Sequence, residues 1–226
     1  MRKIIDIYNE YKIMPNLQEH QLEVAAVALQ VCDSLDIELK RNDIATACLL
    51  HDMGNIIKFN LNYFPDFLKP KGLKYWQNVQ NEYLKKYGKD EHKAVQNIVK
   101  ELGVSKSVSE ILNSIGFSKA KENLNSGNLS NKVASYADMR VGPTGIFLLE
   151  QRLSDLQERY QKKKNINHTS GLITGINPIE DDARKISEDS LRKIEQQIFS
   201  HSKIKPEDIT GESIKSYVGK LKDFKI

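Results

Sequence analysis

Apolar residues recur at intervals of three and four along most of the chain, which is the periodicity of amphipathic helices. The clearest stripe runs from Leu17 to Leu35 and includes His20 among its apolar positions. A second stretch opens at Asn42, the predicted N-cap, and closes at Gly54, a residue type that commonly follows a helix end. These two stretches predict two helices that each turn an apolar face toward the protein interior.

The helical periodicity continues to the end of the chain with two interruptions. Residues 55–74 form an irregular insert with Pro65 and Pro70, which has room for a short helical turn at 65–68. Residues 164–180 are polar and contain glycine, which is typical of a linker or a mobile loop. Further helices are predicted at about 75–87, 90–102, 105–115, 130–140, 144–163, 181–199 and 210–223.

The predicted fold class is all-α, because no run of alternating apolar and polar residues indicates a β-strand. The chain has 226 residues, of which 39% are hydrophobic, and this is enough for a sizeable core. We expect a compact multi-helix domain over 1–163, followed by a linker and a C-terminal helical appendage over 164–226. The appendage either docks on the first domain or mediates assembly into a homo-oligomer.

The charge of the chain is nearly balanced, with 34 Lys and Arg residues against 30 Asp and Glu residues. A dedicated nucleic-acid binder usually concentrates its basic residues on one face, so this composition disfavours nucleic acid as the partner. A short basic cluster at 159–164 falls at the end of a predicted helix, where the helix dipole favours cations. The composition is compatible with a small anionic substrate.

The expected location is the cytoplasm, without a membrane partner. Cys32 and Cys48 lie on apolar helical faces, which is typical of buried, reduced cysteines. The first residues carry charges inside their apolar run, which is untypical of a signal peptide. No apolar segment approaches the roughly 20 residues that a membrane-spanning helix requires.

The adjacent residues His51 and Asp52 carry the most informative chemistry in the sequence. They follow an apolar helical stretch that begins at Ile44, so both side chains leave the last turn of a helix that should be buried. A carboxylate is electrostatically misplaced there, because the C-terminal end of a helix carries partial negative charge. A buried carboxylate at that position needs a compensating cation, and a metal ion is the natural candidate.

Two further candidate ligands point toward the interior. His20 lies on the apolar stripe of its helix, and Asp138 shares a helical face with small residues such as Ala134, which leave room for an ion and a substrate. Taken alone, a buried histidine is more often a hydrogen-bonded core residue, and Asp138 could pair with Arg140. The prediction therefore depends on the joint occurrence of the two histidines and the two aspartates.

Two imidazoles and two carboxylates are suitable ligands for a divalent metal ion. Imidazole suits transition metals and carboxylates extend the range to manganese and magnesium, so the candidate ions are Mn, Fe, Ni, Co, Zn and Mg. Such a set leaves coordination positions open for water and for a phosphate oxygen. A bound ion would then polarise a phosphoryl group and lower the pKa of water.

The order His20, His51-Asp52, Asp138 resembles that of the HD-domain phosphohydrolase superfamily, which is named for its His-Asp doublet. The resemblance covers about residues 15–160, with Leu-Leu-His-Asp-Met-Gly around the doublet and Ala-Asp-Met-Arg at the last aspartate. It implies an all-α, metal-dependent phosphohydrolase fold. It also implies that His20, His51, Asp52 and Asp138 are the metal ligands.

Some members of this superfamily hold two metal ions through two further histidines. His92 resembles the first of these and lies in the first turn of a helix that Asp90 is predicted to cap. The position resembling the second is Ser118, whose neutral hydroxyl is a poor metal ligand. This departure favours one metal ion and leaves His92 free to act on a substrate phosphate or as a proton donor. The alternative for His92 is a solvent-exposed residue near a helix start.

The predicted catalytic residues are Asp52, His92, Lys58 and Arg140. The resemblance implies that Asp52 both ligates the metal and orients the attacking water. Lys58 could bind a phosphate as a point charge, and Arg140 could bind one in a bidentate manner. The alternatives are a surface lysine on a loop and an arginine that serves as a structural partner for a carboxylate.

The sequence therefore predicts a metal-dependent phosphohydrolase that acts on a nucleotide or another small phosphate ester. A catalytically silent HD-like module that binds a nucleotide or a partner is the alternative, which Ser118 favours. A nucleic-acid-associated protein that uses residues 159–164 is a third hypothesis. Several aromatic residues near the doublet either line a base-binding wall or pack as a lid on the core: Phe59, Tyr63, Phe64, Phe67, Tyr75 and Trp76.

Overall fold

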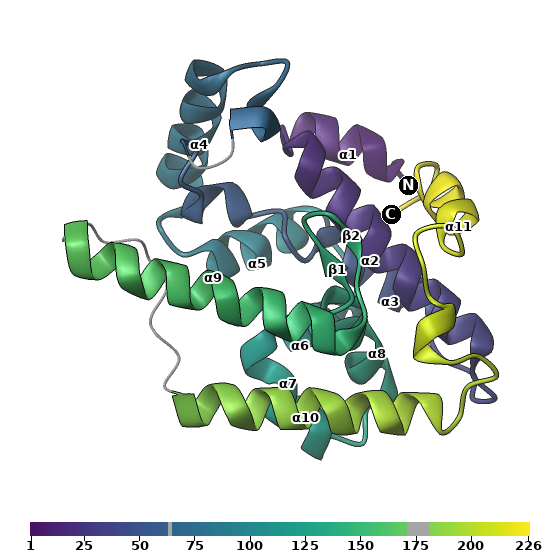
Figure 1. Cartoon of the computed structure of the whole chain (residues 1–226). Coiled ribbons are helices and arrows are strands. Elements are labelled where there is room, and N and C mark those ends of the chain that lie inside the picture. The colour runs from purple at the N-terminus through teal and green to yellow at the C-terminus, as the bar shows by residue number, and fades with distance from the viewer. Residues whose placement is uncertain (63–64, 171–180) are drawn as a thin grey trace.

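The structure is a computed structural model that describes residues 1–62, 65–170 and 181–226 (Figure 1). Helices dominate it, and the prediction of an all-α protein is confirmed. The α-helices of the described residues are α1 (Ile4–Glu10), α2 (Pro15–Ser34), α3 (Arg41–Leu50), α4 (Leu73–Tyr87), α5 (Glu91–Glu101), α6 (Lys106–Ser114), α7 (Ala120–Asn125), α8 (Leu129–Asp138), α9 (Leu149–Ser170), α10 (Asp181–Phe199) and α11 (Lys215–Leu221).

Short elements connect these helices. Strands β1 (Val141–Gly142) and β2 (Gly145–Ile146) form a small antiparallel hairpin between α8 and α9, with Val141 opposite Ile146. The 3-10 helices are η1 (Asn55–Lys58), η2 (Pro65–Leu68), η3 (Phe117–Lys119) and η4 (Pro206–Asp208).

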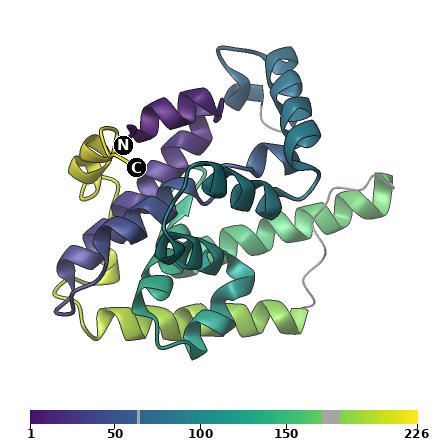
Figure 2. The same ribbon diagram turned by 180° about the vertical axis from the view of Figure 1, so that it is seen from behind.

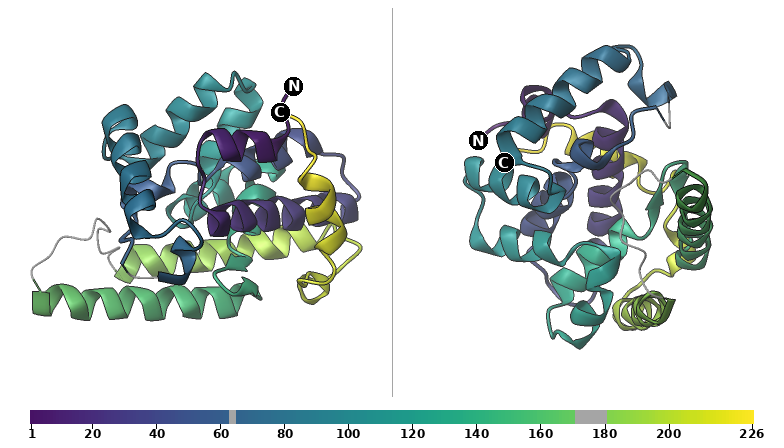
Figure 3. Two further views of the ribbon diagram at one scale, coloured as in Figure 1. Left: turned by 90° about the horizontal axis from the view of Figure 1, so that it is seen from above. Right: turned by 90° about the vertical axis from the view of Figure 1, so that its left-hand side faces the viewer.

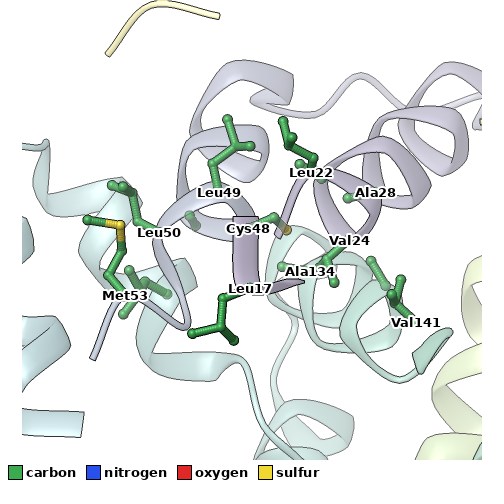
Figure 4. Packing of buried hydrophobic residues seen from close by; sticks show 14 of the residues in the cluster. Leu17, Leu22, Val24, Ala28, Cys48, Leu49, Leu50, Met53, Ala134 and Val141 are labelled. Carbon is green, nitrogen blue, oxygen red and sulfur yellow. The ribbon is translucent and has the colours of Figure 1, made fainter. Parts of the chain in front are cut away.

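Helix α2 is the central element of the fold. Pro15 occupies its first turn, where a proline removes no helical hydrogen bond. Residues Val24 to Ala28 have no exposed surface, and the alanines among them allow neighbouring helices to approach closely. Figure 4 shows Val24 in one packed cluster with Cys48 of α3 and Ala134 of α8. Helices α3, α8 and α11 all pack against α2, so it carries the core on several sides.

The C-terminal helices belong to the same core. Helix α10 packs across α7 and α8, and α11 packs against α2 (Figures 1 and 2). Ile194, Ile198 and Leu221 from these helices are buried in one cluster with residues of α2 and α3. The ends of the chain also meet, because the Arg2 N–H donates to the Ile226 carbonyl over 2.8 Å and the Ile226 N–H donates to Arg2 over 2.9 Å.

Helices α9 and α10 lie along one side of the molecule in both views of Figure 3. Arg192 of α10 joins them through a two-pronged ion pair with Glu150, with distances of 2.7 and 2.9 Å. The prediction of a linker is wrong over 164–170, because α9 continues to Ser170. Residues 149–170 contain no glycine or proline, so a helix already nucleated at Leu149 can propagate to Ser170. Residues 171–180 of the predicted linker lie outside the described residues.

The predicted N-cap of α3 is also wrong. Helix α3 begins at Arg41 with Lys40 in the cap position, and Asn42 lies inside the first turn. Its main-chain carbonyl accepts a hydrogen bond from Thr46 Oγ1 over 2.8 Å. In contrast, Asp90 caps α5 as predicted, because its side chain accepts a hydrogen bond from the Lys93 N–H over 3.0 Å.

The insert 55–74 and the start of α4 pack on the core through aromatic residues. The predicted turn at 65–68 is present as η2. Trp76 is buried, and its Nε1 donates a hydrogen bond to the Leu68 carbonyl over 3.1 Å. Phe59, Phe67 and Tyr75 are partly buried against the same core, whereas Tyr63 and Phe64 lie outside the described residues. Among the helices described here, none combines the length and apolarity that crossing a membrane requires.

Candidate metal centre

Three elements bring the predicted ligands together. His20 lies in α2, His51 and Asp52 lie on the turn directly after α3, and Asp138 is the last residue of α8. The Nε2 atoms of His20 and His51 each lie 3.3 Å from Asp138 Oδ1. Asp52 bridges the same two rings, with Oδ2 3.7 Å from His20 Nε2 and Oδ1 3.6 Å from His51 Nε2. The four side chains therefore form one compact cluster.

The ring of His51 is held so that one nitrogen faces the cluster. Its Nδ1 lies 2.7 Å from the carbonyl oxygen of Cys48, and because a carbonyl only accepts, Nδ1 carries the hydrogen. In the neutral ring that binds a metal ion, Nε2 would then present its lone pair to the cluster, and this atom is buried without a hydrogen-bond partner. A ligating histidine usually has this arrangement, in which the other ring nitrogen donates to a carbonyl. The orphaned Nε2 therefore fits a metal ion.

Protons compensate the negative charge of the cluster when no cation is bound. Burial lowers the pKa of His51, but Asp52 and Asp138 outweigh burial and raise this pKa to about 9. Burial also raises the pKa of Asp138, but the two adjacent imidazoles outweigh it and hold this pKa well below its ordinary value. A divalent cation would supply the same compensation in place of these protons, so the charge of the donor set fits a metal ion.

The ends of two helices add to this preference for a cation. Asp138 ends α8, and His51 is the C-cap residue of α3. Both helices thus direct their C-terminal ends, which carry partial negative charge, at the cluster. The misplaced carboxylate that the sequence indicated at Asp52 therefore lies in a region that favours positive charge.

Two residues fix the turn that carries the His-Asp doublet. Gln21 is fully buried, and its Oε1 accepts a hydrogen bond from the Asp52 N–H over 3.2 Å. Gly54 allows α5 to pack against the turn, since a Cβ there would lie 2.5 Å from the Glu91 carbonyl oxygen. The sequence prediction missed Gln21, although a polar residue between His20 and a run of buried apolar residues was a usable signal.

Lys58 and His92 meet at a common carboxylate beside the turn. Lys58 Nζ lies 3.4 Å from Glu91 Oε1, and His92 Nε2 lies 3.8 Å from the same oxygen. The His92 side chain is 81% exposed, which matches the solvent-facing alternative for its position. The structure thus brings these two residues to Glu91, and it does not place either within the cluster of four.

Arg140 and Ser118 lie apart from the cluster in different ways. Arg140 is fully buried, and its guanidinium donates to the Phe147 carbonyl, the Tyr136 hydroxyl and the main chain of η4. These contacts match the structural alternative, although the partners are mainly carbonyls and not a carboxylate. Ser118 is exposed on η3.

The family model described as HD domain matches residues 17–138, which is more than half of the chain. The match begins three residues before His20 and ends at Asp138, so it spans the whole cluster. No curated protein and no solved structure matches the chain. The geometry of the doublet and the extent of the match agree, and the chain belongs to the HD-domain family.

Proposed function

We propose that this protein is a metal-dependent phosphohydrolase that acts on a nucleotide or another small phosphate ester. The observation that carries the proposal is the cluster itself, in which the Nε2 atoms of His20 and His51 lie 3.3 Å from one oxygen of Asp138 and Asp52 faces both rings. One divalent ion of the group Mn, Fe, Ni, Co, Zn and Mg is the proposed cofactor. When bound, it would polarise the phosphoryl group and lower the pKa of water.

The side chains around the site have two proposed roles, which are to bind the metal ion and to orient the attacking water. The imidazoles of His20 and His51 and the carboxylates of Asp52 and Asp138 would hold the ion. Asp52 retains partial exposure and can orient the attacking water toward phosphorus through one of its two oxygens. Lys58 and His92 lie beside the turn that carries the doublet, and we propose that they neutralise charge on the phosphate oxygens.

The proposal includes a small phosphorylated partner and a cytoplasmic location, and it includes neither a membrane nor nucleic acid as partner. Arg159 is the one basic residue of the stretch 159–164 whose side chain the structure describes, and it pairs with Asp155 at 3.0 Å within its own helix, so it gives no support to nucleic acid as partner. A catalytically silent binding module remains the alternative, and the exposed position of Ser118 is the observation that keeps it open.

The test compares wild-type protein with His51→Ala. Elemental analysis should give about one metal ion per wild-type chain and none in the variant. Phosphate release should then be measured from nucleoside mono-, di- and triphosphates and from a phenyl phosphate ester, with manganese, nickel or cobalt present. We expect metal-dependent release by the wild-type protein and none by His51→Ala.

His201→Ala is the matched control, because this exposed histidine lies after α10 and contacts Asp36 at 3.6 Å. It should keep both metal and activity. A folded, metal-loaded wild-type protein that releases no phosphate from any of these esters would contradict the hydrolase assignment. Recovery of an intact nucleotide from such a protein would support the silent module instead.

A further inference from the structure

The position of Asp138 depends on the chain that directly follows it, because this ligand is the last residue of α8. Two residues later, Arg140 is buried with no exposed surface. Its Nε donates to the Phe147 carbonyl, and the Phe147 N–H donates back to the Arg140 carbonyl over 2.7 Å. The turn after Asp138 is thus locked by both the main chain and the side chain of one arginine.

The other arm of this guanidinium reaches the C-terminal segment. Arg140 Nη2 donates to the carbonyls of Pro206 and Ile209, at 3.0 and 3.2 Å. Pro206 begins the 3-10 helix η4 and Ile209 is its C-cap residue. The start of η4 is fixed by Asp208, whose Oδ2 accepts a hydrogen bond from the Lys205 N–H over 2.8 Å. The carbonyls of Pro206 and Ile209 are therefore fixed in position to accept hydrogen bonds from Arg140, which holds the end of α8.

A second set of hydrogen bonds also joins Arg140 to the C-terminal part of the chain, here to helix α10. Arg140 Nη1 donates to the Tyr136 hydroxyl, which in turn donates to Glu195 Oε2 of α10 over 2.7 Å. A buried arginine needs a nearby negative charge, and here a hydroxyl relays it from Glu195. Both Glu195 and η4 lie outside residues 17–138, the part of the chain that matches the HD-domain family.

We propose that Arg140 is a positioning residue for Asp138 and that it makes residues 195–209 a working part of the metal centre. The inference rests on the proposed metal site. A guanidinium suits this task because its donors diverge in a fixed plane and here reach four separate acceptors. A lysine ammonium has the same charge but cannot span the same acceptors, so Arg140→Lys should leave the end of α8 less well fixed.

The experiment measures manganese binding by calorimetry and the visible absorption spectrum of the cobalt-loaded protein. We expect Arg140→Lys to weaken manganese binding about tenfold or more, the size usual for loss of a group that orients a ligand. The cobalt spectrum should change as well, because it reports the geometry of the ligands. Tyr136→Phe removes a single hydroxyl and should give a smaller change in the same direction.

Arg192→Lys is the matched control. It disrupts the ion pair with Glu150 that ties α10 to α9, at 2.7 and 2.9 Å, and this pair includes no residue of α8. It should leave manganese affinity and the cobalt spectrum unchanged. If Arg140→Lys does not fold, Tyr136→Phe decides the question.

Folded Arg140 and Tyr136 variants with wild-type affinity and spectrum would overturn the inference, and so would an equal loss in Arg192→Lys. A wild-type protein that takes up no metal would instead overturn the proposed function, and this inference with it. The two failures are therefore distinguishable by the behaviour of the wild-type protein.

Discussion

The side-chain oxygen of Gln21 accepts a hydrogen bond from the main-chain N–H of Asp52 over 3.2 Å. Gln21 is the neighbour of His20 on α2, so consecutive residues of one helix face the cluster and clamp the turn that carries the doublet. The Gln21 Nε2 is buried without a hydrogen-bond partner. Gln21 thus supports the doublet with its oxygen but leaves a buried donor unsatisfied, which destabilises the fold. Its contribution to metal binding should therefore be larger than its contribution to stability.

Gln21→Met should weaken metal binding far more than it destabilises the fold. The lost hydrogen bond would destabilise the protein by about 1 kcal/mol, but removal of the buried, unpartnered amide offsets part of this cost. Manganese affinity, measured by calorimetry, should fall about tenfold because the doublet loses its support. Gln30→Met is the control on the same helix, since Gln30 accepts a hydrogen bond from Ser213 at 2.9 Å and should not change the affinity.

Gly54→Ala should destabilise the protein by about 1–3 kcal/mol, the usual cost of overpacking. The added Cβ would meet main-chain oxygen of Glu91 at 2.5 Å and Ala94 Cβ at 3.0 Å, so α5 must move away from the turn. Gly219→Ala in α11 has no atom within 4 Å of its Cβ and should stabilise by about 0.5–1 kcal/mol. Urea unfolding measures both changes, and equal effects of the two substitutions would contradict the packing argument.

A metal ion should stabilise the folded protein by mass action. Manganese at about a hundred times its dissociation constant should raise the free energy of unfolding by about 2.7 kcal/mol, provided the unfolded chain binds none. Thermal unfolding with and without a chelator measures the gain. His51→Ala should abolish it and His201→Ala should retain it, and an equal gain in His51→Ala would place the ion elsewhere.

Lys58→Met and His92→Gln should lower the specificity constant for a phosphate ester without changing the metal content of the protein. Both residues meet at Glu91, with Lys58 Nζ 3.4 Å from its Oε1, and neither lies within the four-residue cluster. We expect a loss of about tenfold to a hundredfold for a group that neutralises phosphate charge. Unchanged steady-state kinetics in both variants would show that Lys58 and His92 are surface residues without a role in the reaction.

Glu101 should make stability depend on acid pH. Burial raises the pKa of its carboxyl, but hydrogen bonds from Lys86, Tyr11 and Tyr87 outweigh burial and lower this pKa below its ordinary value of 4.5. The stabilisation is therefore complete above the unfolded-state pKa and is lost as the pH falls through the lower folded-state pKa. The side chain is 37% exposed, so solvent screening limits the contribution to about 1 kcal/mol or less.

Urea unfolding of wild type and Glu101→Gln across this acid range measures the effect. Wild type should be the more stable protein near neutral pH, and the difference should shrink as the solution becomes acidic. A difference that grows toward acid pH would contradict the assigned direction of the shift.

The cluster could be predicted from the sequence because every member of it leaves a local pattern. His20 interrupts an apolar stripe, Asp52 ends an apolar helix at its negative end, and Asp138 sits among small residues. Each of these signals can be read within a single helix. Packing of the apolar helix faces in the core then brings the four side chains together. The same reasoning predicted most helices and the cap at Asp90, which also depend on neighbouring residues.

Contacts between distant segments left no such pattern. Whether Arg140 binds a phosphate or the main chain depends on Pro206 and Ile209, which are more than sixty residues away along the chain. The start of α3 shows the same limit on a smaller scale. Asn42 has the right chemistry for a cap, but the chain turns into the helix at Lys40, and a cap preference alone does not fix where that turn falls.

The meeting of the two chain ends has a practical consequence for handling the protein. Arg2 and Ile226 exchange two main-chain hydrogen bonds, and Lys3 Nζ reaches Asp223 Oδ1 at 2.7 Å. A tag or fusion partner joined at either end therefore leaves the molecule from the same place, between α1 and α11 (Figure 1). We therefore expect a bulky fusion at either end to crowd both ends, because the hydrogen bonds at this place belong to both.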